Sequence, residues 1–176
     1  MVEKGLIDKA IFGIYIEDIN GEIHFGDTDS DYYTEPILYA PVLSDTYWLT
    51  EMNQASFGNH SIGPRKIIID SGTSLLITTI KDAQQIHSKI KGSKRNEDGT
   101  YQIPCVLKNK LPDLVLTIND HIILTLSSKD YVLVPLSNNK TMCISGIQGK
   151  DTHKLDHWVL GNVFMKAYYT VIIKSF

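Results

Sequence analysis

The sequence of 176 residues has only two cysteines, no excess of positive charge and no long apolar run. Its 17 lysines and arginines are outnumbered by 20 aspartates and glutamates, so we expect no nucleic-acid partner and no attraction to an anionic membrane. No stretch approaches the roughly 20 apolar residues that span a bilayer. The opening MVEKGLIDKA lacks the apolar core of a signal peptide. We therefore expect no membrane segment in this chain.

The two cysteines, Cys105 and Cys143, leave two interpretations open. They fit two buried free thiols, and they fit one disulfide, which would indicate an oxidising compartment. Two N-glycosylation sequons, beginning at Asn59 and Asn139, are compatible with a secretory route, although such tripeptides are frequent by chance.

Most of the chain alternates short β-rich stretches with turn signals, and its length suits one domain. AIFGIYIEDINGEIHFG predicts a hairpin with Asn20 and Gly21 in a type I′ turn. Asn119 and Asp120 predict a second hairpin between two β-rich arms. The fold class is therefore mainly β with short helices. Further strands are expected at 37–43, 45–57, 130–136 and 142–147, and a short helix at 163–168 after Asn162.

A longer helix is expected over 80–90, because its apolar residues recur at helical spacing. Thr78 or Thr79 can cap its start, and Gly92 can end it. The predicted apolar face consists of Ile80, Ala83, Ile86 and Ile90.

One acidic residue directly follows an apolar run. IIIDSGTSLL, at 67–76, places Asp70 after three isoleucines and before Ser71, Gly72, Thr73 and Ser74. Gly72 allows a sharp turn that brings an amide near the carboxylate, and hydroxyl donors favour its charged form. The loop can therefore hold an acid in fixed geometry. An ordinary polar turn remains an alternative; a ligase-recognised degradation signal would require an exposed segment, which the apolar flanks disfavour.

A second motif gives this loop a context. HWVLGNVFMKAYYTV, at 157–171, places Val159, Leu160 and Gly161 ahead of a short helix and a strand. An Asp-[Ser/Thr]-Gly-Thr-Ser loop followed later by two apolar residues and glycine resembles the pepsin-like aspartic proteases. In that family the apolar-apolar-Gly turn packs beneath the catalytic loop. Asn162 stands where the family often has aspartate.

The resemblance covers essentially all of residues 1–176 and is to one half of a two-lobed molecule. GEIHFGDTDSDYYTEPILYAPV, YWLTEMNQASFG and LPDLVLTIN are similar to segments of the family's second lobe. The resemblance implies a pepsin-like acid protease lobe, the C-terminal one, with the N-terminal lobe absent from these residues. The lysine- and asparagine-rich loops are similar in composition to those of the protozoan plasmepsins.

The resemblance also implies roles for individual residues. Asp70 would be the catalytic acid, and Thr73 would hydrogen-bond its outer oxygen. Gly72, Thr73 and Ser74 would bind substrate, and Ser71 would reach toward the other lobe. Apolar walls of the cleft and support of the loop would come from Ile68, Val159, Tyr47, Leu160 and Gly161. For Ile68, Val159 and Tyr47, ordinary core packing is an equal alternative.

The family's enzymes use two aspartates, one from each lobe, and this sequence has one Asp-[Ser/Thr]-Gly. We therefore expect an aspartic endopeptidase that acts on peptides or proteins, needs no cofactor, and is inactive as residues 1–176 alone. By resemblance, Cys105 pairs with Cys143 and the compartment is the secretory pathway, extracellular or an acidic, lysosome-like vacuole. The alternatives are an inactive peptide- or partner-binding relative and a homodimeric half-protease.

A metal site is not expected. His153 and His157 are four residues apart, and Asp156 lies between them. The segment has the pattern of a loop entering a strand, and no Cys or His cluster completes a ligand set.

Overall fold

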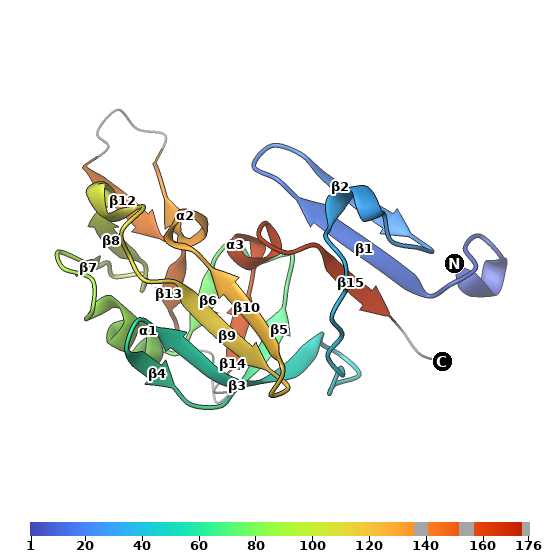
Figure 1. The fold of residues 1–176 in the computed structure, drawn as a ribbon, viewed down its shortest axis with the longest axis horizontal. Coiled ribbons are helices and arrows are strands. Elements are labelled where there is room, and N and C mark those ends of the chain that lie inside the picture. The colour runs from blue at the N-terminus through green and yellow to red at the C-terminus, as the bar shows by residue number, and fades with distance from the viewer. Residues whose placement is uncertain (136–140, 152–156, 174–176) are drawn as a thin grey trace. The chain divides into compact units, whose positions relative to one another are not determined.

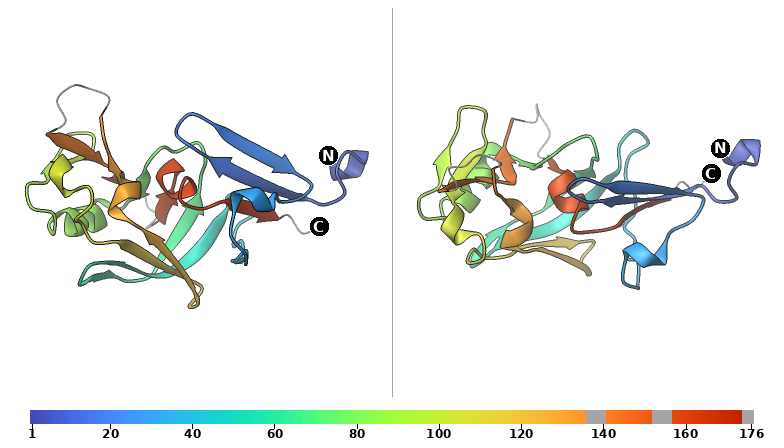
Figure 2. Two further views of the ribbon diagram at one scale, coloured as in Figure 1. Left: turned by 45° about the horizontal axis from the view of Figure 1, so that its top comes forward. Right: turned by 90° about the horizontal axis from the view of Figure 1, so that it is seen from above.

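The computed structural model describes residues 1–135, 141–151 and 157–173. The fold divides into two compact units (Figure 1, with further views in Figure 2). The first unit is Met1–Leu38 with Met165–Phe176, and the second is Tyr39–Phe164. None of the described helices is long and apolar enough to cross a membrane.

The first unit is built on an antiparallel sheet in the order β15-β1-β2. Gly13 lies opposite Val171 in this sheet, and a β-carbon at Gly13 would stand 2.0 Å from the hydroxyl oxygen of Tyr169. Glycine therefore lets the Tyr169 ring cover the middle of β1. The elements are η1 (Val2–Lys4), β1 (Ile11–Ile16), β2 (Gly21–Phe25), η2 (Ser30–Tyr32) and β15 (Thr170–Ile173).

The β1–β2 hairpin is confirmed, but its predicted type I′ turn is wrong. Gly21 belongs to β2 and pairs with Ile16, and the amide of Glu17 donates to the carbonyl oxygen of Asn20 at 2.8 Å. The connection is thus longer than two residues. The positive φ values of such a turn occur instead at Asn119 (48°) and Asp120 (62°), in the other predicted hairpin.

The second unit contains a mixed sheet in the order β10-β9-β3-β5-β14-β6-β13, with β4 paired to β3. A smaller sheet has the order β11-β12-β8-β7. The larger sheet consists of β3 (Leu49–Phe57), β4 (His60–Ile62), β5 (Arg65–Ile69), β6 (Leu76–Thr78), β9 (Leu114–Ile118), β10 (Ile122–Leu126), β13 (Ile147–Gly149) and β14 (His157–Leu160). The smaller sheet consists of β7 (Lys94–Arg95), β8 (Tyr101–Pro104), β11 (Val132–Leu133) and β12 (Met142–Ser145).

The described residues are mainly β, as expected, and the helices are short. These are α1 (Ile80–His87), η3 (Cys105–Leu107), α2 (Ser128–Tyr131) and α3 (Asn162–Met165). The core of the second unit is mostly apolar. Its largest fully buried side chains include Trp158, Phe57, Met52, Ile67, Leu76 and Ile86.

The helix predictions hold in part. Thr79 caps α1, its hydroxyl accepting from the amide of Asp82 at 3.1 Å, and Gly92 lies beyond the helix end with φ of 83°. Ala83, Ile86 and Ile90 are buried, but Ile80 of the predicted face is 36% exposed. The second helix is shorter than predicted, and Asn162 is its first residue rather than the residue before it.

Two further expectations about secondary structure are wrong. Residues 37–43 form no strand. Pro36 and Pro41 explain this, since proline has no amide hydrogen for a sheet ladder. The strand expected over 130–136 is wrong at its start, because 130–131 belong to helix α2 and β11 covers only Val132–Leu133. Helix α2 begins with a capping box in which Ser127 and Asp130 bond each other's backbone amides.

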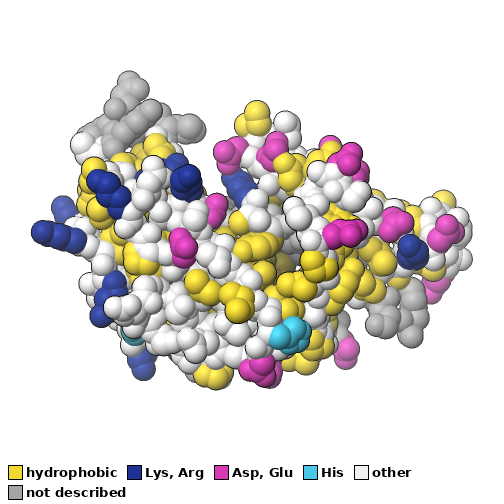
Figure 3. Space-filling view, viewed as in Figure 1, with side chains coloured by type: hydrophobic (Ala, Val, Ile, Leu, Met, Phe, Trp, Pro, Cys, Tyr) yellow, Lys and Arg dark blue, Asp and Glu magenta, His cyan; other side chains and the backbone are white. Residues whose placement is uncertain are grey.

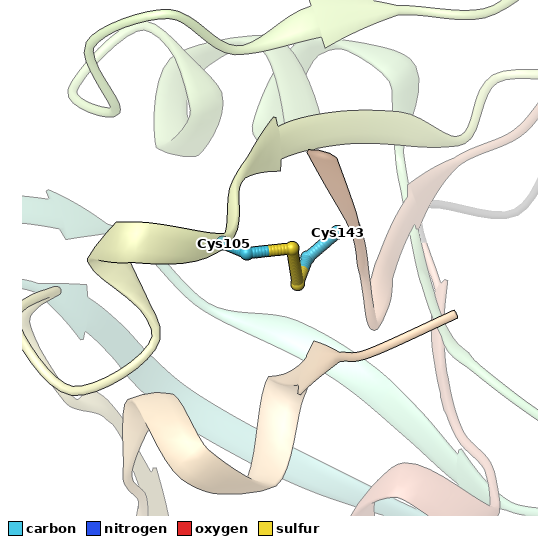
Figure 4. Close-up of a disulfide and its surroundings, with 2 residues drawn as sticks. All are labelled: Cys105 and Cys143. Carbon is cyan, nitrogen blue, oxygen red and sulfur yellow. A yellow bond between two sulfur atoms is a disulfide. The ribbon is translucent and has the colours of Figure 1, made fainter. Parts of the chain in front are cut away.

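The disulfide between Cys105 and Cys143 is present (Figure 4). Cys105 follows the end of β8, and Cys143 lies in the neighbouring strand β12, opposite Ile103. Their Cα atoms are 4.9 Å apart, a separation that disulfides commonly span. The bridge fastens the small sheet at a site separate from the Asp70 loop.

Candidate active site

Three adjacent strands of the larger sheet position Asp70. β14 runs parallel to β5 and antiparallel to β6, so that Leu160 lies beside both Ile69 and Leu76. The chain leaves β5 at Asp70, turns, and returns as β6 on the far side of β14. The amide of Asp70 donates to the carbonyl oxygen of Leu160 at 3.1 Å. The acid thus stands at the end of a strand, tied to the last residue of its neighbour.

The carboxylate of Asp70 is held by its own loop. The amide of Gly72 donates to Oδ1 at 2.9 Å, and the hydroxyl of Thr73 donates to Oδ2 at 2.6 Å. Hydrogen bonds to an ionised acceptor are stronger than those between neutral groups. Each oxygen therefore has one fixed donor, while the Asp70 residue remains only half-buried.

The bend after β14, at 161–163, is hydrogen-bonded to the loop that follows Asp70. The amide of Asn162 donates to the carbonyl oxygen of Thr73 at 2.7 Å, and that of Val163 to the carbonyl oxygen of Ser74 at 3.1 Å. A β-carbon at Gly161 would stand 2.2 Å from the Thr73 oxygen. Only glycine fits at this close approach. The acid loop and the bend are therefore joined backbone to backbone.

The residues around the carboxylate offer an accessible polar surface. Ser71, Gly72 and Ser74 are exposed, whereas Thr73 is half-buried by its contact with Asp70. A ligand can therefore reach backbone and hydroxyl groups on either side of the acid. The structure brings all members of the predicted loop, from Asp70 to Ser74, to one place.

Apolar surface lies next to the loop. Ile68 and Val159 are partners in the parallel β5–β14 ladder, and both are half-buried. Side chains alternate along a strand, so these two lie on the face opposite the buried Ile67 and Trp158. Neither is therefore a fully buried core residue.

Tyr47 precedes β3, beside the C-terminal end of β5. It is 61% exposed, and the carbonyl oxygen of the next residue, Trp48, accepts from the amide of Ile69 at 3.0 Å. The segment before β3 is thereby fixed beside the residue that precedes Asp70. This backbone contact was not predicted, because no local sequence pattern indicates it.

A buried network of charged and polar side chains around Asp82 was also not predicted from the sequence. Asp82 on α1 is fully buried, and it accepts from Nε of Arg65 and from Nε1 of Trp158, each at 2.9 Å. Burial, the largest influence, raises the pKa of Asp82, but the hydrogen bonds from Arg65 and Trp158 together hold it below its ordinary value. The available signal was an acid beside Ala83 on the apolar face of the predicted helix.

No metal site can be assigned within the described residues. No group of three or more His, Cys, Asp or Glu side chains among them is arranged to hold an ion. His153 and Asp156, two of the candidate ligands in the sequence, lie outside the described residues.

The chain is similar in sequence to proteins of a known family. A family model described as eukaryotic aspartyl protease matches residues 1–173. Cathepsin D of Canis lupus familiaris is 35% identical over 181 residues, covering 97% of this chain and 44% of that protein. Cathepsin D of Dictyostelium discoideum is 32% identical over 97% of the chain and 46% of its own length. Pepsin A of Sus scrofa is 33% identical over 98% and 46%. The chain thus spans less than half the length of these relatives.

Proposed function

This chain belongs to the eukaryotic aspartyl protease family, and on that premise we propose that it is the C-terminal lobe of a two-lobed aspartic endopeptidase in which Asp70 is one of two catalytic acids. The observation that carries the proposal is the fixed carboxylate of Asp70. It is bonded by Gly72 and Thr73 and stands against the bend at Gly161.

The second acid would come from outside residues 1–176. The sequence has one Asp-[Ser/Thr]-Gly, and the chain matches less than half of each relative reported above. Apolar side chains are exposed on the face drawn in Figure 3, and large apolar residues exposed in the second unit include Val42, Leu43 and Tyr47. Exposed apolar surface of this kind supports a partner that covers part of the lobe.

The proposed mechanism needs two carboxylates that share one proton. Two carboxyl groups about 3 Å apart cannot both be ionised, because their negative charges repel, so one stays protonated while the other is charged. The charged carboxylate takes a proton from a water molecule as the water oxygen attacks the peptide carbonyl carbon. The protonated carboxyl donates its proton to the carbonyl oxygen, which gives a tetrahedral gem-diol. The C–N bond then breaks as the proton taken from water passes to the amine nitrogen, a hydroxyl of the diol returns a proton to the other carboxylate, and no acyl-enzyme forms. Thr73 and Gly72 would keep the Asp70 oxygens in place through these proton transfers.

A peptide is the substrate that the surroundings of Asp70 favour. The exposed backbone of Gly72 and the hydroxyl of Ser74 would bond an extended peptide main chain, and Ser71 would reach toward the other lobe. Ile68 and Val159 would contact apolar side chains of the substrate, with Tyr47 at the rim. Thr73 serves substrate binding indirectly, because its hydroxyl is committed to Asp70.

We place the protein in the secretory pathway, outside the cell or in an acidic, lysosome-like vacuole. The Cys105–Cys143 disulfide supports this location, since structural disulfides persist in oxidising compartments and are rare in the cytosol.

A comparison of two purified forms tests the proposal. The longer protein that contains this chain should cleave an unfolded protein substrate at acid pH and be inhibited by pepstatin, and residues 1–176 alone should not cleave it. Pepstatin-sensitive cleavage by residues 1–176 as a dimer would indicate a homodimeric half-protease instead. A longer protein that binds peptides without cleaving them would indicate an inactive relative.

A further inference from the structure

We propose that Asn59 carries an N-linked glycan, at the tip of the β3–β4 hairpin. Asn59, His60 and Ser61 form the sequence Asn-x-Ser, with a residue other than proline at the middle position, which is the acceptor for this modification. The inference uses the secretory route proposed above, but it is independent of peptidase activity.

The hairpin presents the acceptor to solvent. Phe57 pairs with His60, so the turn consists of Gly58 and Asn59. Gly58 has φ of 56°, the conformation that a glycine in the first central position of a two-residue hairpin turn supplies. Asn59 is exposed at the tip, so its side-chain nitrogen is accessible for attachment of a saccharide.

The second residue that the modification needs is exposed as well. Along β4, Ser61 is exposed and Ile62 is buried, as the alternation of side chains in a strand requires. Phe57 and Ile62 anchor the hairpin in the core, with exposed fractions of 1% and 4%. The packed residues thus hold Asn59 and Ser61 outward together.

The glycan would lie far from the Asp70 loop. β3 and β5 are antiparallel, with Leu49 beside Ile68 and Met52 beside Arg65. Asp70 follows the C-terminal end of β5, whereas β3 continues past Met52 to Phe57 in the opposite direction. At about 3.3 Å per residue, Asn59 and Asp70 are separated by on the order of 30 Å along the sheet. A saccharide at Asn59 therefore leaves a peptide cleft at Asp70 open.

The glycan would also shield an exposed edge. In the described sheet, β4 pairs with β3 and has no strand on its other side. Unpaired strand edges can pair with another chain, and proteins commonly cover them. A glycan on the adjoining turn is one such cover.

The experiment is expression of the longer protein in a eukaryotic secretory host, followed by mass spectrometry. Chymotryptic cleavage after Phe57 isolates the peptide that begins at Gly58. We expect this peptide to carry hexose and N-acetylhexosamine, and peptide-N-glycosidase in ¹⁸O water to convert Asn59 to labelled aspartate. Asn59→Gln and Ser61→Ala should each abolish the label, Ser61→Thr should retain it, and Asn139→Gln should leave it unchanged.

An unmodified Asn59 in secreted protein overturns the inference. Because the protein was secreted, it passed through the glycosylating compartment, so the failure lies with the acceptor hairpin and leaves the proposed secretory route and peptidase function standing. Peptide cleavage by Asn59→Gln should equal that of the unmutated protein, since the glycan lies away from Asp70.

Discussion

Gly161 lies directly against the backbone carbonyl of Thr73, with no room for a side chain between them. A β-carbon at position 161 would be 2.2 Å from that oxygen and 2.5 Å from the carbonyl oxygen of Leu75. Both contacts are with backbone atoms of the acid loop, which cannot rotate away as a flexible side chain can. The position of Asp70 therefore depends on a glycine in a distant part of the sequence.

We predict that Gly161→Ala displaces the acid loop. The substitution should lower the free energy of unfolding by about 2 kcal/mol, the usual cost of overpacking, and reduce peptide cleavage by the two-lobed protein. Denaturant unfolding and cleavage rates measure the two effects. Gly63→Ala is the matched control, because a β-carbon there meets no atom within 4 Å. Equal behaviour of the two variants would contradict the prediction.

The ion pair of Asp82 and Arg65 should be necessary for stability. Asp82→Asn leaves the Arg65 guanidinium, whose side chain is 21% exposed, without its charged partner. Loss of one member of a buried pair costs about 3–5 kcal/mol, and denaturant unfolding measures it. Asp27→Asn, which breaks the exposed Lys9–Asp27 pair, is the control and should change stability little. A similarly small effect of Asp82→Asn would show that the network is dispensable.

Acid should weaken the second unit through His87. Its Nδ1 is 2.7 Å from the carbonyl oxygen of Ala83, its Nε2 is 2.8 Å from Oγ of Ser145, and its ring stacks on Tyr101. Burial lowers the pKa of His87 to about 4 from an ordinary value of 6.5. Between these values the unfolded chain binds a proton that the folded chain does not. Stability is therefore complete above pH 6.5 and falls as the pH drops toward 4, by on the order of 3 kcal/mol.

The pH dependence of unfolding tests this prediction. His87→Gln removes the titrating group, so its free energy of unfolding should fall less than that of the unmutated protein between pH 6.5 and 4. His121→Gln, at an exposed position, should leave the pH dependence unchanged. If His87→Gln retains the full dependence, other groups cause the acid sensitivity.

Reduction of the disulfide should cost a substantial part of the stability. The bridged cysteines are 38 residues apart, and loop-closure entropy for that separation corresponds to about 4 kcal/mol. Unfolding by urea with and without a reductant measures the difference. In a Cys105→Ser, Cys143→Ser double variant, the reductant should have no effect. A loss below about 1 kcal/mol on reduction would show that the bridge constrains the unfolded chain little.

The sequence was informative where the determinant is local. The acid after an apolar run, the Thr79 cap and the hairpin at Asn119 and Asp120 each follow from neighbouring residues. Pro36 and Pro41, before and within 37–43, and the Ser127–Asp130 capping box are equally local signals, and they favour the irregular segment and the helix that the structure shows. Gly21 misled the hairpin prediction because pairing with Ile16, rather than turn propensity, places it in β2.

The parts that could not be predicted depend on contacts between distant residues. Nothing near Arg65 indicates that Asp82 and Trp158 will surround it, because the three come from different elements. The pairing of β5 with β14 was likewise available only through the resemblance of two motifs to a family. The division into two units follows from residues 165–173 returning to β1, which no local pattern reveals.

The central claim, that Asp70 is one acid of a catalytic pair, is tested most directly by Asp70→Asn in the two-lobed protein. Asp98→Asn is the matched control, because Asp98 also sits in a tight turn and accepts hydrogen bonds from the amide and hydroxyl of Thr100. We predict that Asp70→Asn abolishes peptide cleavage while its unfolding transition is retained, and that Asp98→Asn cleaves normally. Cleavage by Asp70→Asn at the unmutated rate would contradict the account.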